Sequence, residues 1–191
     1  MPDDVAQSTG AYLVVVLEGR TEDQLEADVG EVADQLAKAG AHDVYVLSPG
    51  QGSQLLTARE NAFWMVKAAG ADDLIDMVVP RNQIPEYLRR VAAIAADDDS
   101  RVYGCGHAGD GNIHFSVYQP DDERRSRLMS TIYSMGTSLG GAISGEHGIG
   151  RSKRGYFQAL VDPGLLDLQR RIKAAFDPAG ILNPGCIFDP A

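Results

Sequence analysis

Residues 104–114 read GCGHAGDGNIH and join two short runs of β-prone residues, at 102–103 and 115–118. Glycine and asparagine readily adopt the positive φ that a tight turn requires, so this stretch predicts a β-hairpin. The hairpin would bring His107 and His114 to the same end of a sheet, although they lie seven positions apart in the sequence.

A second unusual stretch follows at residues 144–153, SGEHGIGRSK, where Glu146 and His147 lie between two glycines. Two imidazoles and a carboxylate on glycine-rich turns form a set that zinc, manganese or iron can accept. His107, His114 and Glu146 are therefore candidate metal ligands, and His147 is a candidate base. Spacing alone leaves a second interpretation open, in which these histidines are hydrogen-bonded structural residues.

The remaining pattern alternates between strands and helices. Apolar, β-prone runs predict strands at residues 11–17, 42–47 and 74–79, and a short strand is expected at 142–144. Capping residues and helical spacing predict helices that begin near residues 22, 53, 85, 122 and 163. Residues 1–10 are expected to be frayed and residues 11–191 to form one domain. This order favours an α+β fold, with a mixed, largely antiparallel sheet covered by helices and a ferredoxin-like duplication.

Composition narrows the class of protein. The chain of 191 residues has a formal net charge of −10, which argues against nucleic acid or an anionic membrane as the main partner. No signal peptide and no membrane span are expected, and only two cysteines favour the cytoplasm. Cys105 shares the predicted strand face of His107, so a thiolate ligand is conceivable, but a buried inert thiol is favoured.

Three motifs together resemble the C-terminal domain of FAD-linked oxidases. They are GHAGDGNIH at 106–114, SGEHGIGRSK at 144–153 and AFDPAGILNPG at 175–185. That family contains glycolate oxidase, D-lactate dehydrogenase and D-2-hydroxyglutarate dehydrogenase. ARENAF at 58–63 also resembles the arginine-bearing helix of the glycolate-oxidase branch.

The resemblance implies a role for each candidate residue. His107, His114 and Glu146 match the ligands of a divalent metal. His147 matches the base that takes the substrate hydroxyl proton while hydride leaves for the flavin. Arg59 matches the arginine that binds the substrate carboxylate, whereas from its helical position alone snorkelling to water is favoured.

The resemblance also implies a contact between the tail and the flavin, and the chain differs from the hydroxyglutarate enzymes at two positions. Asn183 lies in the tail motif that approaches the flavin in such proteins. The hydroxyglutarate enzymes carry an asparagine where this chain has Ser116, and a lysine where it has Leu74. A smaller 2-hydroxy acid such as glycolate or lactate is therefore expected as substrate.

Nothing in the chain resembles the family's N-terminal FAD-binding domain, and no glycine-rich dinucleotide motif follows a predicted strand. The expected function is thus the substrate- and metal-binding cap of an FAD-dependent 2-hydroxy-acid dehydrogenase or oxidase. Its FAD would be bound mainly by a partner domain or subunit, and the chain alone is expected to show little turnover. Self-association through exposed apolar surface is a further expectation.

Two other classes of function remain open. One is a stand-alone metal- or carboxylate-binding module without catalysis. The other is a zinc hydrolase that uses metal-bound water and needs no flavin.

Overall fold

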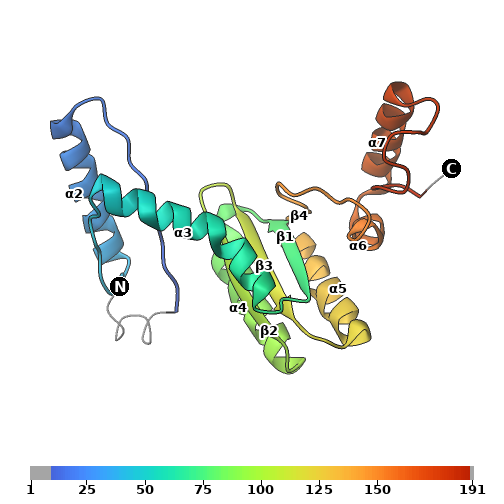
Figure 1. The fold of residues 1–191 in the computed structure, drawn as a ribbon, viewed down its shortest axis with the longest axis horizontal. Coiled ribbons are helices and arrows are strands. Elements are labelled where there is room, and N and C mark those ends of the chain that lie inside the picture. Colours follow the sequence, from blue (N-terminus) through green and yellow to red (C-terminus); the bar gives the residue numbers. More distant parts are fainter. Residues whose placement is uncertain (1–9, 190–191) are drawn as a thin grey trace. The chain divides into compact units, whose positions relative to one another are not determined.

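The computed structural model describes residues 10–189, apart from the side chain of residue 63 (Figure 1). The expectation of a frayed terminus at residues 1–10 falls outside this range except for residue 10, which is exposed and has no regular secondary structure. The chain divides into two compact units, residues 1–61 and residues 62–191. Among the described helices, none has both the length and the apolar character needed to cross a membrane.

The first unit contains helix α2 (Glu22–Lys38) and most of helix α3 (Pro49–Ala68). The capping pattern correctly predicts where α2 begins, because the Thr21 hydroxyl accepts a hydrogen bond from the Gln24 amide at 3.2 Å. Gly40, two residues after the last helical residue, has a φ of +90°, which a glycine adopts without strain.

The two strands predicted for this unit are not present. Residues 11–17 and 42–47 have no regular secondary structure, and their large apolar side chains are mostly exposed. A strand is stabilised by hydrogen bonds to a neighbouring strand, and among residues 10–189 neither run belongs to the four-stranded sheet. Hydrophobic pattern alone could not show that the partner is missing.

The second unit contains an antiparallel sheet of four strands, β1 (Asp73–Val78), β2 (Arg101–His107), β3 (Asn112–Tyr118) and β4 (Ala142–Ile143). A short 3₁₀ turn, η1 (Arg81–Gln83), leads into helix α4 (Ile84–Asp97), and helix α5 (Asp122–Ser138) connects β3 to β4. The sequence of elements is therefore β-α-β-β-α-β, and the strand order is β2-β3-β1-β4. This is the ferredoxin-like arrangement, so the predicted α+β class is confirmed.

The hydrophobic core lies between one face of this sheet and helices α4 and α5 (Figure 1). Alternate residues of β1 and β3 supply its sheet side because strand side chains alternate between faces. The core side chains are Ile75, Met77, Ile113, Phe115 and Val117 from the sheet, and Tyr87, Val91, Leu128, Met129, Ile132 and Tyr133 from the helices. The opposite face of β1, β2 and β3 carries the polar residues of the candidate site.

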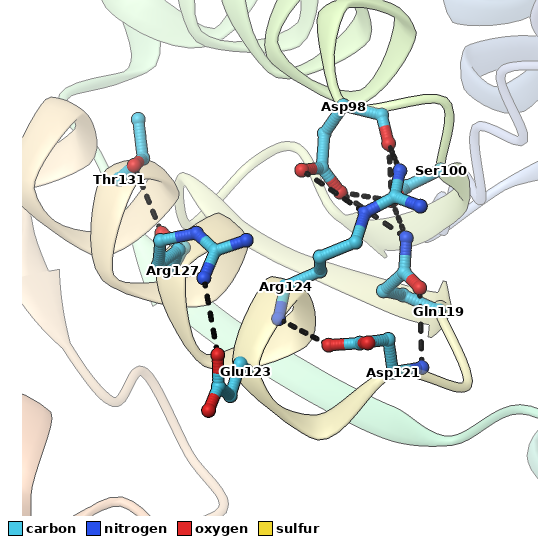
Figure 2. A network of polar contacts seen from close by, with 8 residues as sticks. All are labelled: Asp98, Ser100, Gln119, Asp121, Glu123, Arg124, Arg127 and Thr131. Carbon is cyan, nitrogen blue, oxygen red and sulfur yellow. Dashed lines mark hydrogen bonds and ion pairs between the residues drawn. The ribbon is translucent and has the colours of Figure 1, made fainter.

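A polar network fixes the end of the sheet far from the hairpin turn (Figure 2). Gln119 is buried and donates hydrogen bonds to Ser100 at 2.7 Å and to Asp98 at 3.2 Å. Arg124 donates to the backbone carbonyl of Asp98, and Asp121 caps α5 by accepting from the Arg124 amide. These contacts connect the ends of α4 and β3 to the starts of β2 and α5.

Helices α6 (Arg154–Leu160) and α7 (Pro163–Phe176) and an irregular tail follow the sheet. The start of α7 is as predicted, because Asp162 accepts from the Leu165 amide at 3.0 Å, whereas α6 was not expected. Arg151 and Arg154 donate to the tail carbonyls of Pro184 and Gly185 at 3.0 and 2.9 Å. These arginines therefore hold the tail in place.

Candidate metal centre

The strand register explains why the two hairpin histidines meet. His107 is the partner of Asn112 in the β2–β3 ladder, and His114 lies two residues after Asn112 on the same face of β3. The turn between the strands closes with a hydrogen bond of 3.0 Å from the Asp110 amide to the His107 carbonyl. Gly111 occupies the turn position that needs a positive φ, at +78°. The predicted hairpin is therefore confirmed.

Glu146 reaches this face from the turn that follows β4. Its Oε1 lies 3.2 Å from His107 Nε2 and 3.0 Å from His114 Nε2. The nearest ligand atoms of His107, His114 and Glu146 all lie within 4.8 Å of one another. The structure thus brings together the three residues that the sequence singled out from two separate stretches.

These distances suit a small cation. Ligand atoms bound at about 2.1 Å in a tetrahedral site lie about 3.4 Å apart, so the two distances from Glu146 to the histidines fall a few tenths of an ångström short of that spacing. The two imidazoles and one carboxylate are a donor set that zinc, manganese and iron accept. Half of the Glu146 side chain is exposed, at 49%, which leaves solvent-side positions free for another ligand. The residues present therefore fit a divalent metal.

The burial of His114 also favours metal binding, because it favours the neutral form of the imidazole. Its side chain is 14% exposed, and this burial lowers the pKa of His114 because the charged imidazolium loses solvation. The nearby Asp76 carboxylate acts in the opposite direction but does not reverse the shift. Neutral imidazole is the form that binds metals, so His114 is ready to be a ligand at neutral pH.

His147 lies at the edge of the same cluster. Its ring is 4.9 Å from that of His114, centre to centre, and its Nε2 is 3.7 Å from Glu146 Oε1. The side chain is 60% exposed. A histidine that is adjacent to a metal set and open to solvent can exchange a proton with a bound molecule, which the role of base requires.

The other sequence candidates are not among the three residues that the structure groups. Cys105 is exposed, which corrects the expectation of a buried thiol, and it is not one of the grouped ligands. Arg59 is an exposed residue of α3 in the first unit. Asn183 is exposed in the tail and has a φ of +47°, a conformation that asparagine tolerates better than most residues.

Two residues that organise the site were missed in the sequence. Asp76 lies in β1, where it is 8% exposed, and it is directly opposite His114 in the ladder. Ser144 donates a hydrogen bond to Asp76 Oδ2, and the Ser144 oxygen accepts from the Gly148 amide at 2.8 Å. The one signal was an aspartate inside the otherwise apolar run that formed the predicted strand 74–79.

The sequence of this α+β domain was compared with models of known protein families. The family model of the C-terminal domain of FAD-linked oxidases matches residues 1–187, so the chain belongs to this family. The resemblance in the three motifs is therefore confirmed over nearly the whole chain.

Curated relatives agree with this assignment. The chain is 51% identical to an uncharacterized FAD-linked oxidoreductase of Mycobacterium tuberculosis over 188 residues, which cover 98% of this chain and 41% of that protein. It is 36% identical to a D-lactate dehydrogenase of Anaerostipes hadrus, with 93% of this chain and 39% of the relative covered. It is also 36% identical to glycolate oxidase subunit GlcD of Escherichia coli, with 92% and 36% covered. The chain thus spans about two fifths of the length of these relatives.

Proposed function

We propose that this chain is the substrate- and metal-binding cap of an FAD-dependent 2-hydroxy-acid dehydrogenase or oxidase. The substrate would be a glycolate- or D-lactate-like acid, and the product the corresponding 2-oxo acid. One observation carries the proposal: His107, His114 and Glu146 converge beside His147 in a chain of the FAD-linked oxidase family.

Different residues of the chain would bind the metal and transfer the proton. His107, His114 and Glu146 would hold a divalent metal, which supplies a Lewis acid for the hydroxyl and carboxylate of the substrate. His147 accepts the hydroxyl proton at a ring nitrogen. The hydrogen bond of 2.8 Å from its backbone amide to Asp76 fixes the backbone from which this side chain projects. FAD, held mainly by a partner domain or subunit, supplies the hydride acceptor.

Arg59 and Asn183 complete the proposed set on the basis of their motifs. The planar guanidinium of Arg59 can bind the substrate carboxylate through two parallel hydrogen bonds. Asn183 is proposed to contact the flavin through its place in the tail motif.

The polar face of the sheet favours a small substrate. Leu74 and Ser116 are directly paired between β1 and β3, and Ser116 lies two residues after His114 on the same face. Both residues are uncharged, and Ser116 is 7% exposed. A diacid needs a cation for its second carboxylate, and this pair of positions offers none. Glycolate and lactate have no second carboxylate, so they are the preferred substrates.

The test is flavin reduction in a reconstituted enzyme. The chain would be combined with the remaining, FAD-binding part of the Mycobacterium tuberculosis relative. The loss of flavin absorbance would then be followed without oxygen after adding D-lactate, glycolate or D-2-hydroxyglutarate. We expect reduction by one of the two smaller acids and slower reduction by the diacid.

The His147→Gln variant tests the base. We expect the variant to retain its metal, while flavin reduction slows by at least about 100-fold, the usual contribution of a general base. His42→Gln is the matched control, because His42 is exposed in the first unit and outside the cluster. Unchanged reduction by His147→Gln would remove His147 from the role of base. Metal binding without reduction by any 2-hydroxy acid would instead favour the stand-alone binding module.

A further inference from the structure

Asp76 is a buried carboxylate that is not among the predicted site residues. Its side chain projects from β1 onto the face that carries His114, and the two residues are directly paired in the ladder. Among the described residues, His114 is its one ion-pair partner, and no lysine or arginine pairs with it. A buried charge without a cation must be stabilised by hydrogen-bond donors, so the donors around Asp76 show what it holds in place.

One oxygen of Asp76 holds the turn that carries Glu146 and His147. Oδ2 accepts hydrogen bonds from the Ser144 hydroxyl, from the Glu146 amide at 3.1 Å and from the His147 amide at 2.8 Å. Three donors on one oxygen fix the backbone of the turn at the two residues whose side chains enter the cluster. Three donors on one oxygen are the partners that an ionised carboxylate accepts, so the geometry indicates that Asp76 carries its negative charge.

The other oxygen faces the metal-ligand candidate. Asp76 Oδ1 lies 3.4 Å from His114 Nδ1, and both atoms are buried without a hydrogen-bond partner among the described residues. Each atom is therefore the natural partner of the other. An ionised carboxylate only accepts, so the contact is satisfied when His114 carries its proton on Nδ1.

This tautomer has a direct consequence at the opposite ring nitrogen. With the proton on Nδ1, neutral His114 presents a lone pair at Nε2, which lies 3.0 Å from Glu146 Oε1. Two electron-rich atoms at this distance repel each other unless a cation lies between them, and in the metal-free chain the Glu146 side chain, 49% exposed, can turn its carboxylate toward solvent. A histidine that binds a metal through one nitrogen usually donates its other N–H to a carboxylate or carbonyl, which fixes the ring and raises its basicity.

We propose that Asp76 is the positioning residue of this site. Its two oxygens set the tautomer of His114 and the placement of Glu146 and His147 at the same time. The inference rests on the proposed function in taking His107, His114 and Glu146 as the metal set. The competing interpretation is that Asp76 only caps the turn, and that His114 instead carries its proton on Nε2 and donates it to Glu146.

The first measurement needs no variant. The metal-free chain, labelled with ¹⁵N, would be studied by long-range ¹H–¹⁵N correlation NMR at a pH where His114 is neutral. We expect the protonated nitrogen of His114 to be Nδ1. A neutral His114 protonated on Nε2 would overturn the proposal.

The second measurement compares variants by calorimetric titration with Zn²⁺ and Mn²⁺. Asp76→Asn keeps the shape of the side chain but weakens it as an acceptor, and we expect a loss of metal affinity of about 10–100-fold, as is usual for such partners of metal ligands. Asp73→Asn is the matched control, because Asp73 lies in the same strand and pairs with Lys153 instead of the site. Equal affinities in wild type, Asp76→Asn and Asp73→Asn would overturn the proposal.

Ser144→Ala separates the two functions of Asp76. This variant removes one of the donors to Oδ2 and leaves the Oδ1–His114 contact in place. We expect the His114 tautomer to be unchanged and the metal affinity to fall by less than in Asp76→Asn. A Ser144→Ala chain whose His114 changes tautomer would contradict the division of roles between the two oxygens.

These readouts involve neither flavin nor hydroxy acid, so the two hypotheses can fail separately. If Asp76→Asn weakens metal binding while no hydroxy acid reduces the reconstituted flavin, the proposed function fails and the role of Asp76 stands. If the flavin is reduced normally and neither the tautomer nor the metal affinity depends on Asp76, the proposed role of Asp76 fails and the proposed function stands.

Discussion

Glu146 is the residue on which the proposed metal centre depends most, because its Oε1 is the atom that both His107 and His114 approach. Glu146→Gln retains the length of the side chain but replaces an anionic ligand by a neutral amide. We expect the affinity for Zn²⁺ and Mn²⁺ to fall by at least about 100-fold, more than for loss of an outer hydrogen-bond partner. Isothermal titration calorimetry of the purified chain measures this change.

Asp110→Asn is the control for charge alone. Asp110 is exposed in the hairpin turn, and its loss changes the net charge by the same amount without removing a member of the grouped ligands. Both variants are expected to keep the stability of the wild type within about 0.5 kcal/mol, because neither side chain is buried. Equal affinities for Glu146→Gln and Asp110→Asn would rule out Glu146 as a ligand.

At this scale the sequence predicted which side chains converge but not what supports them. His107, His114 and Glu146 could be singled out because histidines in glycine-rich turns are unusual, and the structure brings the three together. Asp76 could not, because its role depends on its register opposite His114, which exists only in the folded sheet. A single aspartate in an apolar run resembles an interruption of the pattern.

Among the elements, the turn after β4 must approach β3 closely to deliver Glu146. A Cβ added at Gly145 would lie 2.4 Å from the side chain of Asn112, which is 5% exposed and has little room to move. We expect Gly145→Ala to displace the turn, to lower metal affinity about 10-fold and to cost about 1–3 kcal/mol of unfolding free energy, as overpacking usually does. Thermal unfolding and metal titration measure the two effects.

Gly155→Ala serves as the control for this steric argument. Gly155 is in α6, and a Cβ there would meet nothing within 4 Å. Adding Asn112→Ala to Gly145→Ala should recover part of the lost affinity, because it removes the atoms that the new methyl group would strike. No recovery in the double variant would show that the turn is displaced for another reason.

The elements were predictable where their cause is local. Thr21, Asp121 and Asp162 marked the starts of helices correctly because a cap acts within three residues. The strands expected at 11–17 and 42–47 are absent from the described structure because a strand depends on a distant neighbour. Strand pairing depends on distant residues, so the sequence predicted a ferredoxin-like type of fold but not which residues pair in the order β2-β3-β1-β4.

For the whole molecule, two features matter: the chain spans 41% of its Mycobacterium tuberculosis relative, and it exposes many large apolar side chains. On α7 and the tail, the exposed residues are Leu165, Leu168, Ile172, Phe176, Ile181 and Leu182. Exposed apolar surface of this kind is typical of a contact with another domain or chain. We expect the remaining part of that relative, loaded with FAD and added as a separate chain, to form a yellow complex with this one.

The variants Phe176→Ser and Ile181→Ser test whether this surface forms the contact. Phe176 and Ile181 are 82% and 74% exposed, so their replacement should leave the chain folded and weaken the complex by at least about 10-fold. Leu88→Ser is the control, because Leu88 is also exposed, at 39%, but lies on α4. Affinity would be measured by titrating the flavin-containing chain and following its absorbance. If all three variants bind like the wild type, the contact involves another surface, and the apolar runs at 11–17 and 42–47 become the next candidates, since they too are exposed.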